Sequence, residues 1–130
     1  MADSLYKEII LDHYRSPRNK GRLNPADYSH EDVNPLCGDE IVLDLRVKDG
    51  VISEVAFEGR GCAISQAAAS ILTEMVEGRP LDEVKAITKD DVLEELGVPI
   101  SPARMKCALL GLKCLKAGIY GIGHIHDDDL

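Results

Sequence analysis

The sequence predicts an α+β domain in which helices pack on one face of a small antiparallel sheet. Apolar and polar residues alternate through most of residues 41–57, whereas apolar residues recur at helical spacing from Ile64 onward. Strands followed by helices, rather than strands alternating with helices, favour this architecture. A length of 130 residues with 45% hydrophobic content is enough for one core, so we expect a single domain over residues 1–130.

The N-terminal half begins with a helix and continues into a hairpin. Apolar residues at helical spacing predict a helix over residues 5–14, capped by Asp3 or Ser4. The following loop leads to residues 27–33, which allow a short edge strand. Residues 41–47 and 51–57 then predict two strands, and Asp49-Gly50 between them is typical of a tight hairpin turn.

The C-terminal half is predicted to be helical. A helix over residues 64–76 stops at Gly78-Arg79-Pro80, and a short one follows to Ile87. Thr88 and Asp91 have capping-box spacing before a helix that ends at Gly97. The last helix begins at Ser101-Pro102, with an apolar stripe and a glycine-rich end: Met105, Ala108, Leu109, Leu112, Leu115, then Gly118, Gly121 and Gly123. We expect a flexible tail from about residue 119.

Charge and composition exclude several classes of function. Fifteen Lys and Arg against 23 Asp and Glu give a net charge of −8, which repels nucleic acid and favours partners with basic surfaces. No apolar run is long enough to span a membrane, and the N-terminus does not have the pattern of a secretion signal. We therefore expect a cytoplasmic protein. In a reducing compartment its four cysteines would serve metal binding or catalysis more often than disulfides.

Three of the cysteines lie near the ends of predicted elements. Cys37 stands in a turn ahead of the hairpin, with Gly38 beside it and Asp39 two residues on. Cys62 follows Gly59-Arg60-Gly61 just before a helix, where the positive end of the helix dipole stabilises a thiolate. Cys107 lies in the second turn of the last helix. Three thiolates and one carboxylate would suit zinc, or iron in a small iron–sulfur cluster.

The fourth cysteine, Cys114, is excluded from this group by helix geometry. It follows Cys107 by seven residues, which is about 10 Å along the axis at ~1.5 Å per residue. Two ligands of one zinc ion, each about 2.3 Å from the metal, cannot be so far apart. The long spacings among the other cysteines leave scattered structural cysteines open as an alternative to a metal site. We do not include His124 and His126 in the site, because they lie in the polar C-terminal tail.

Four motifs resemble the U-type iron–sulfur cluster assembly family, which includes IscU, SufU and the N-terminal domain of NifU. They are DHYRSPRNKG, NPLCGDEI, FEGRGCAISQAAASILTEMVEG and SPARMKCALLGLKCL. The resemblance implies a three-stranded sheet covered by helices and a site for zinc or a transient [2Fe-2S] cluster. It also implies that the ligands are Cys37, Asp39, Cys62 and Cys107. The sulfur donor would be a cysteine desulfurase, with Cys37 and Cys107 as the candidate persulfide acceptors, and the cluster would pass to apo iron–sulfur proteins.

Two functions follow from this resemblance. The first is a scaffold that builds a [2Fe-2S] cluster and hands it on; the second is a SufU-like zinc-dependent sulfurtransferase, and a structural zinc domain is a third interpretation. Lys106 replaces the histidine that precedes the third cysteine in the IscU branch, whereas residues 63–106 leave no room for the insertion typical of SufU. The IscU chaperone motif Leu-Pro-Pro-Val-Lys corresponds to residues 100–104, Ile-Ser-Pro-Ala-Arg, so chaperone recognition is doubtful. Both a monomer and a cluster-dependent dimer fit the sequence.

Overall fold

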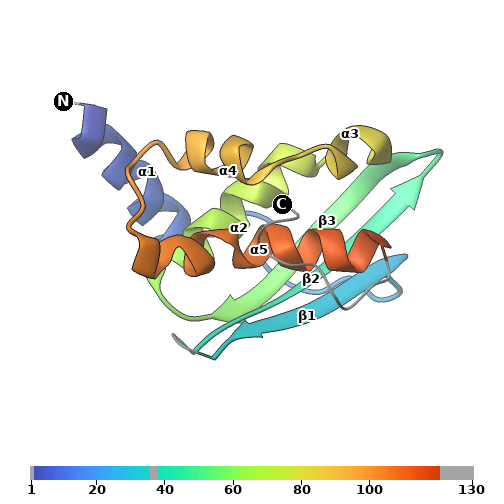
Figure 1. The fold of residues 1–130 in the computed structure, drawn as a ribbon. Helices are drawn as coiled ribbons and strands as arrows, with labels where there is room; N and C mark the ends of the chain where they lie inside the picture. The colour runs from blue at the N-terminus through green and yellow to red at the C-terminus, as the bar shows by residue number, and fades with distance from the viewer. Residues whose placement is uncertain (1, 36–37, 121–130) are drawn as a thin grey trace.

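A computed structural model describes residues 2–35 and 38–120 (Figure 1). The elements in chain order are α1 (Ala2–Arg15), β1 (Tyr28–Asn34), β2 (Asp39–Lys48), β3 (Val51–Arg60), α2 (Ala63–Val76), α3 (Leu81–Lys85), α4 (Lys89–Leu96) and α5 (Pro102–Tyr120). The helices α2 to α5 lie on one side of a three-stranded antiparallel sheet, which confirms the predicted α+β architecture.

The sheet has the strand order β1-β2-β3, and both pairs are antiparallel. Asp49 and Gly50 join β2 to β3 with φ of 54° and 79°. Two positive φ angles are what a type I′ hairpin turn requires, so the predicted Asp-Gly turn is confirmed. The edge strand expected over residues 27–33 is also present, shifted by one residue. Its last residue, Asn34, lies opposite the first residue of β2, Asp39.

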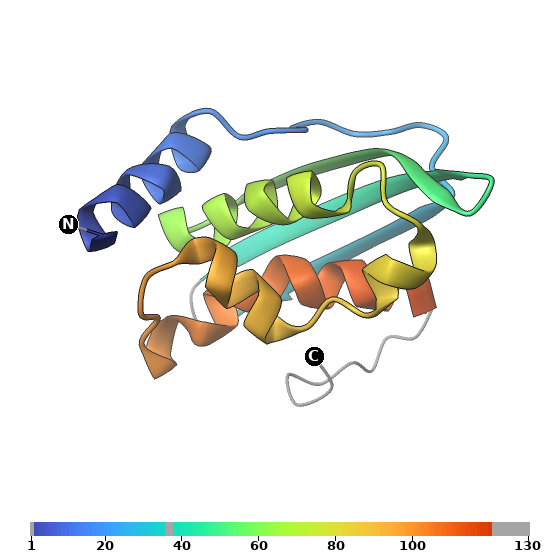
Figure 2. The ribbon, with the colours of Figure 1, turned by 90° about the horizontal axis from the view of Figure 1, so that it is seen from above.

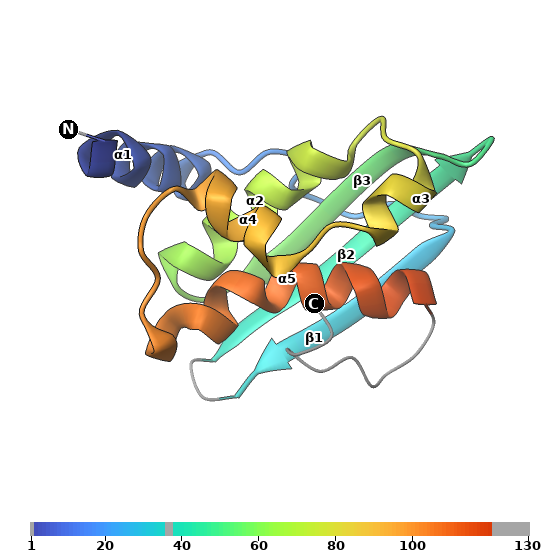
Figure 3. The ribbon, with the colours of Figure 1, turned by 45° about the horizontal axis from the view of Figure 1, so that its top comes forward.

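The core lies between the sheet and the helices. Helix α2 packs on β3, and α5 packs on β1 and β2, as seen from above in Figure 2 and obliquely in Figure 3. The residues of β2 that face the helices, Ile41, Leu43 and Leu45, are almost completely buried. Helices α2 and α5 approach closely because Gly111 faces Ala69, where an added Cβ would lie 3.3 Å from the Ala69 Cα. This close packing sets the separation of the two helices that carry Cys62 and Cys107.

Three sequence-based expectations for the helices differ from the structure. Helix α1 begins at Ala2, ahead of the predicted caps Asp3 and Ser4, since no proline or glycine in this stretch interrupts it. Helix α5 is buried on nearly all sides rather than along one stripe, because it lies between the sheet and the helices α2 and α4. It also continues through Gly118 to Tyr120. Gly118 packs against β1, where an added Cβ would lie 3.3 Å from His30 Cβ, so it serves helix–strand contact.

The predicted capping of α4 is confirmed. Thr88 accepts a hydrogen bond from the Asp91 N–H, and the Asp91 carboxylate accepts one from the Thr88 N–H. Gly97 ends the helix with φ of 72°. Within the described residues no helix has the length and apolar character needed to cross a bilayer.

Candidate metal centre

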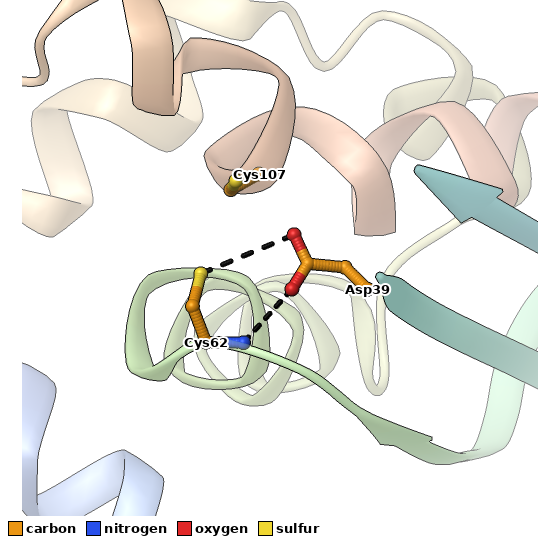
Figure 4. A group of neighbouring side chains, drawn as sticks. All are labelled: Asp39, Cys62 and Cys107. Carbon is orange, nitrogen blue, oxygen red and sulfur yellow. Dashed lines mark hydrogen bonds between the residues drawn. The ribbon is translucent and has the colours of Figure 1, made fainter. Parts of the chain in front are cut away.

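Asp39, Cys62 and Cys107 converge at one end of the molecule (Figure 4). One potential ligand atom from each residue lies within 4.8 Å of the other two. Asp39 and Cys107 are fully buried, whereas Cys62 is partly exposed. They come from the start of β2, the residue before α2 and the second turn of α5, so three segments distant in the sequence supply the group.

Asp39 is held in place by the turn that leads from β3 into α2. Its Oδ1 accepts a hydrogen bond of 2.8 Å from the Cys62 N–H. Gly61 leaves room for this carboxylate, since a Cβ there would lie 2.8 Å from Asp39 Cγ and 2.9 Å from Asp39 Cα. Its φ of +144° is also a conformation that side chains rarely adopt. Gly61 therefore brings the β3–α2 turn against Asp39.

Cys62 is the N-cap residue of α2. Its Sγ accepts a hydrogen bond of 3.5 Å from the Ser65 N–H, and lies 3.9 Å from Asp39 Oδ2. The first N–H groups of a helix lack intrahelical partners and carry the positive end of the dipole. Cys62 therefore stands directly ahead of a helix, as the sequence predicted.

Cys107 approaches the same space from α5. Its neighbours include Asn34, whose side-chain Nδ2 donates to Cys107 Sγ at 3.8 Å. Asn34 is 6% exposed and is the last residue of β1. No spacing or ligand chemistry in the sequence marks Asn34 as a site residue. Its proximity depends on the pairing of β1 with β2 and on the path of α5, and the one available signal was its place at the start of the NPLCGD stretch.

Two predicted features of the cysteines have different outcomes. Cys37 lies outside the described residues, so its place in the ligand group stays a prediction, and the same holds for the exclusion of His124 and His126. Cys114 lies apart from the group, as its spacing predicted. Its Sγ donates to the backbone oxygen of His30 at 3.0 Å and of Ile41 at 3.6 Å. Burial raises the pKa of the Cys114 thiol to about 12, so it stays protonated at neutral pH.

Three further polar residues, Arg60, His13 and Lys106, lie outside the converging group. Arg60 is exposed and forms a surface ion pair with Glu40, in which Arg60 Nε lies 2.8 Å from Glu40 Oε2. His13 is buried, and its Nδ1 lies 2.8 Å from Ser70 Oγ, which makes it a packing residue between α1 and α2. Lys106 is exposed beside a hollow of about 100 Å³ that Asn34 and Lys113 also line.

The donor atoms suit a metal ion. A tetrahedral zinc ion takes thiolate sulfur at about 2.3 Å and carboxylate oxygen at about 2.0–2.2 Å. These bond lengths place the ligand atoms of a tetrahedral ion about 3.6–3.8 Å apart, so atoms that lie within 4.8 Å of one another need only small side-chain movements to meet at a single ion. Two soft sulfurs and one hard oxygen would also suit iron. The described residues thus supply three donors of a site, and an additional ligand would complete a tetrahedron.

Comparison with known proteins identifies the family. The profile of the NifU-like N terminal domain matches residues 5–126. The chain is 35% identical to the zinc-dependent sulfurtransferase SufU of Bacillus subtilis (strain 168), over 90% of each protein. It is 38% identical to the iron–sulfur cluster assembly scaffold protein IscU of Escherichia coli (strain K12), over 88% of this chain and 91% of IscU.

Comparison with solved structures finds relatives of the same kind. A crystal structure of the putative iron–sulfur cluster assembly scaffold protein for the SUF system from Fervidobacterium islandicum AW-1 aligns with a TM-score of 0.77 and 27% identity. The alignment covers 92% of this chain and 99% of that one. The profile match, the sequence identity and the shared fold agree with the four motifs, and the chain belongs to the family of NifU-like N-terminal domains.

Proposed function

We propose that this protein is an iron–sulfur cluster assembly scaffold, which receives sulfur from a cysteine desulfurase and passes a [2Fe-2S] cluster to apo-proteins. The observation that carries the proposal is the convergence of Asp39, Cys62 and Cys107 within 4.8 Å in a chain of this family. Cys37 is the third thiolate that the sequence predicts for the same site. Iron and sulfide are the cargo of the site, and the protein supplies the ligands that hold them.

The mixed ligand set supports transient binding. Thiolates bind iron tightly, whereas a carboxylate oxygen is a harder and poorer partner for a sulfur-rich cluster. Asp39 would therefore be the weakest ligand, and the site could release its cargo to an acceptor. Partial exposure of Cys62 gives an acceptor protein access to one sulfur, while Cys107 holds the cargo from the buried side.

Sulfur reaches the scaffold by exchange with a desulfurase persulfide. A thiolate of Cys37 or Cys107 attacks the outer sulfur of that persulfide and forms a new S–S bond. The bond between the two donor sulfurs breaks, and the desulfurase cysteine leaves as a thiolate. No external oxidant is required, because the transferred sulfur keeps its oxidation state. Each bound sulfur then takes up two electrons, supplied by ferrous iron and excess thiol, so that its S–S bond breaks; the sulfur becomes the sulfide of the cluster and the cysteine returns to a thiolate.

Anaerobic reconstitution tests the scaffold function. The purified protein is incubated with iron, cysteine and a cysteine desulfurase, and ultraviolet–visible absorption and transfer to an apo-ferredoxin are measured. We expect cluster bands in the wild type and in Cys114→Ser, but not in Cys62→Ser, because Cys62 belongs to the converging group and Cys114 does not. Equal bands in Cys62→Ser and the wild type, or no cluster in either, would argue against this function.

A second function, that of a zinc-dependent sulfurtransferase, is favoured by one residue. Lys106 stands immediately before Cys107, where the IscU branch has histidine, and SufU of Bacillus subtilis is among the relatives. Asp39, Cys37, Cys62 and Cys107 would then hold zinc, which stabilises its ligands as thiolates and shields them until the desulfurase docks. Tight stoichiometric zinc, faster desulfurase turnover and no cluster after reconstitution would select this function. If the protein bound zinc but did not change the turnover of the desulfurase, the zinc would have a structural role.

A further inference from the structure

Asn34 is a buried polar residue next to the candidate site that the proposed function does not use. Its side chain comes from the end of β1 and its Nδ2 lies 3.8 Å from the sulfur of Cys107. Both residues are buried, with 6% of Asn34 and 0% of Cys107 exposed. A buried amide N–H requires an acceptor, and a buried sulfur that binds a metal as a thiolate would require a donor. The contact between Asn34 Nδ2 and Cys107 Sγ pairs such a donor with such an acceptor.

The backbone fixes the position of Asn34 relative to the site. Asn34 pairs with Asp39 across the β1–β2 ladder, and its carbonyl accepts a 2.9 Å hydrogen bond from the Gly38 N–H. One side of this hairpin end therefore supplies the ligand oxygen of Asp39. The other side supplies the amide donor to Cys107. A shift in the pairing of the strands would displace both groups together.

The contact joins α5 to the sheet at the point where the sulfur must be aimed. Cys107 belongs to α5, whereas Asp39 and Asn34 belong to the sheet. Helix α5 buries apolar side chains around most of its circumference, and apolar packing alone does not select one direction for a sulfur atom. A hydrogen bond is directional, so the Asn34 amide can select the orientation in which Cys107 Sγ faces Asp39 and Cys62.

We propose that Asn34 is a positioning residue for Cys107, whose amide aims the Cys107 sulfur and accommodates the negative charge it carries as a metal or cluster ligand. Hydrogen bonds to ligand sulfurs tune both metal retention and the reduction potential of iron–sulfur sites. The part that concerns bound metal rests on the proposed function. The contact between Asn34 and Cys107 does not, because it follows from the positions of β1 and α5 in the fold.

Two measurements test the proposal. In the metal-free protein, the ¹⁵N–¹H resonances of the Asn34 side-chain amide should move on Cys107→Ala and stay in place on Cys114→Ala, the matched cysteine on the same helix. With cobalt(II) as the probe, Asn34→Leu removes the donor at similar volume. It should release cobalt to a chelator about tenfold faster than the wild type and shift the sulfur-to-cobalt charge-transfer band.

Thr73→Val is the control for loss of a buried hydrogen bond, because Thr73 is buried on α2 and bonds Asn19 and Ser70 rather than the site. It should release cobalt like the wild type. The proposal would be overturned if the Asn34 amide resonances did not move on Cys107→Ala. It would also be overturned if Asn34→Leu released cobalt at the wild-type rate and kept the wild-type charge-transfer band. A wild type that binds no cobalt would contradict the proposed function instead, and the amide resonances would still decide the Asn34–Cys107 contact.

Discussion

Two buried aspartates on β2 have opposite surroundings. Asp44 is 1% exposed and is surrounded by donors: Arg22 Nε at 2.6 Å, Ser29 Oγ at 2.6 Å and the Leu23 N–H at 3.0 Å. Asp39 is fully buried, and in the part of the chain that the structure describes it has no ion pair with a cation. Its neighbours are the Cys62 N–H and two sulfurs.

The difference distinguishes a structural carboxylate from a candidate ligand. Asp44 faces away from the core residues Leu43 and Leu45, as strand alternation requires, and it fastens residues 22–23 to the outer face of the sheet. Its charge is compensated within the chain. Buried carboxylates are usually paired with a cation or coordinate a metal ion. The surroundings of Asp39 therefore support its proposed role as a ligand.

The largest effect is expected from filling the space that Asp39 occupies. Gly61→Ala places a Cβ against Asp39 and also forces alanine into a φ of +144°. We expect the unfolding free energy to fall by about 2–6 kcal/mol, the sum of backbone strain and overpacking. Chemical denaturation and metal content after purification measure the two consequences.

Gly21→Ala is the matched control, because Gly21 has a φ of +140° and no atom within 4 Å of the added Cβ. Gly21→Ala introduces backbone strain without a steric clash, so it should lower the unfolding free energy by about 1–3 kcal/mol and keep normal metal content. If the two alanine variants lost equal stability and bound equal metal, Gly61 would have no special role in accommodating Asp39.

A smaller loss is expected when Asp44 is replaced. Asp44→Asn should lower the unfolding free energy by about 1–3 kcal/mol, because it removes the charge that Arg22, Ser29 and the Leu23 N–H satisfy. Metal binding should be unchanged. Urea denaturation and zinc content measure the two outcomes, and a loss of zinc with intact folding would show that Asp44 also serves the site.

The same substitution has a pH signature. Burial alone would raise the pKa of Asp44, but the hydrogen bonds from Arg22, Ser29 and Leu23 outweigh burial and hold it below the ordinary value of 3.8. At a pH between the lowered pKa of Asp44 in the folded protein and its ordinary value of 3.8, the unfolded chain binds more protons than the folded one. The stabilisation is thus complete above about pH 4 and is lost as the pH falls through the lowered pKa. The wild type should lose stability more steeply than Asp44→Asn in this acid range.

Local chemistry made most of the fold predictable. The pair Asp49-Gly50 favours the positive φ angles of a tight turn, and Thr88 with Asp91 favours a helix start. Both features therefore follow from a few adjacent residues. The end of α5 did not follow, because Gly118 is a helix breaker by propensity and a contact residue for His30 by packing. Tertiary contact outweighed propensity there, and sequence spacing carries no information about that contact.

The candidate site shows the same limit. Residue chemistry and the family resemblance selected Asp39, Cys62 and Cys107, and the structure brings these three together. The amide of Asn34 was not predicted, because its approach to Cys107 depends on strand register and helix position at once. Ligands have distinctive side chains, whereas the residues that aim them are ordinary polar residues at particular places in the fold.

The smallest effect on stability is expected at Asp39 itself. Asp39→Ala removes an acceptor from the Cys62 N–H, but it also removes a buried carboxyl group that has no ion pair within the described residues, and the two changes offset each other. The metal-free variant should therefore lose less stability than Asp44→Asn. After reconstitution it should keep its cluster longer and transfer it to an apo-acceptor about tenfold more slowly, or about 1.4 kcal/mol in activation free energy, because the weakest ligand is gone. Stopped-flow absorption during transfer measures the rate. Unchanged transfer would mean that Asp39 does not control release, and the contrast with Asp44 would then be one of folding alone.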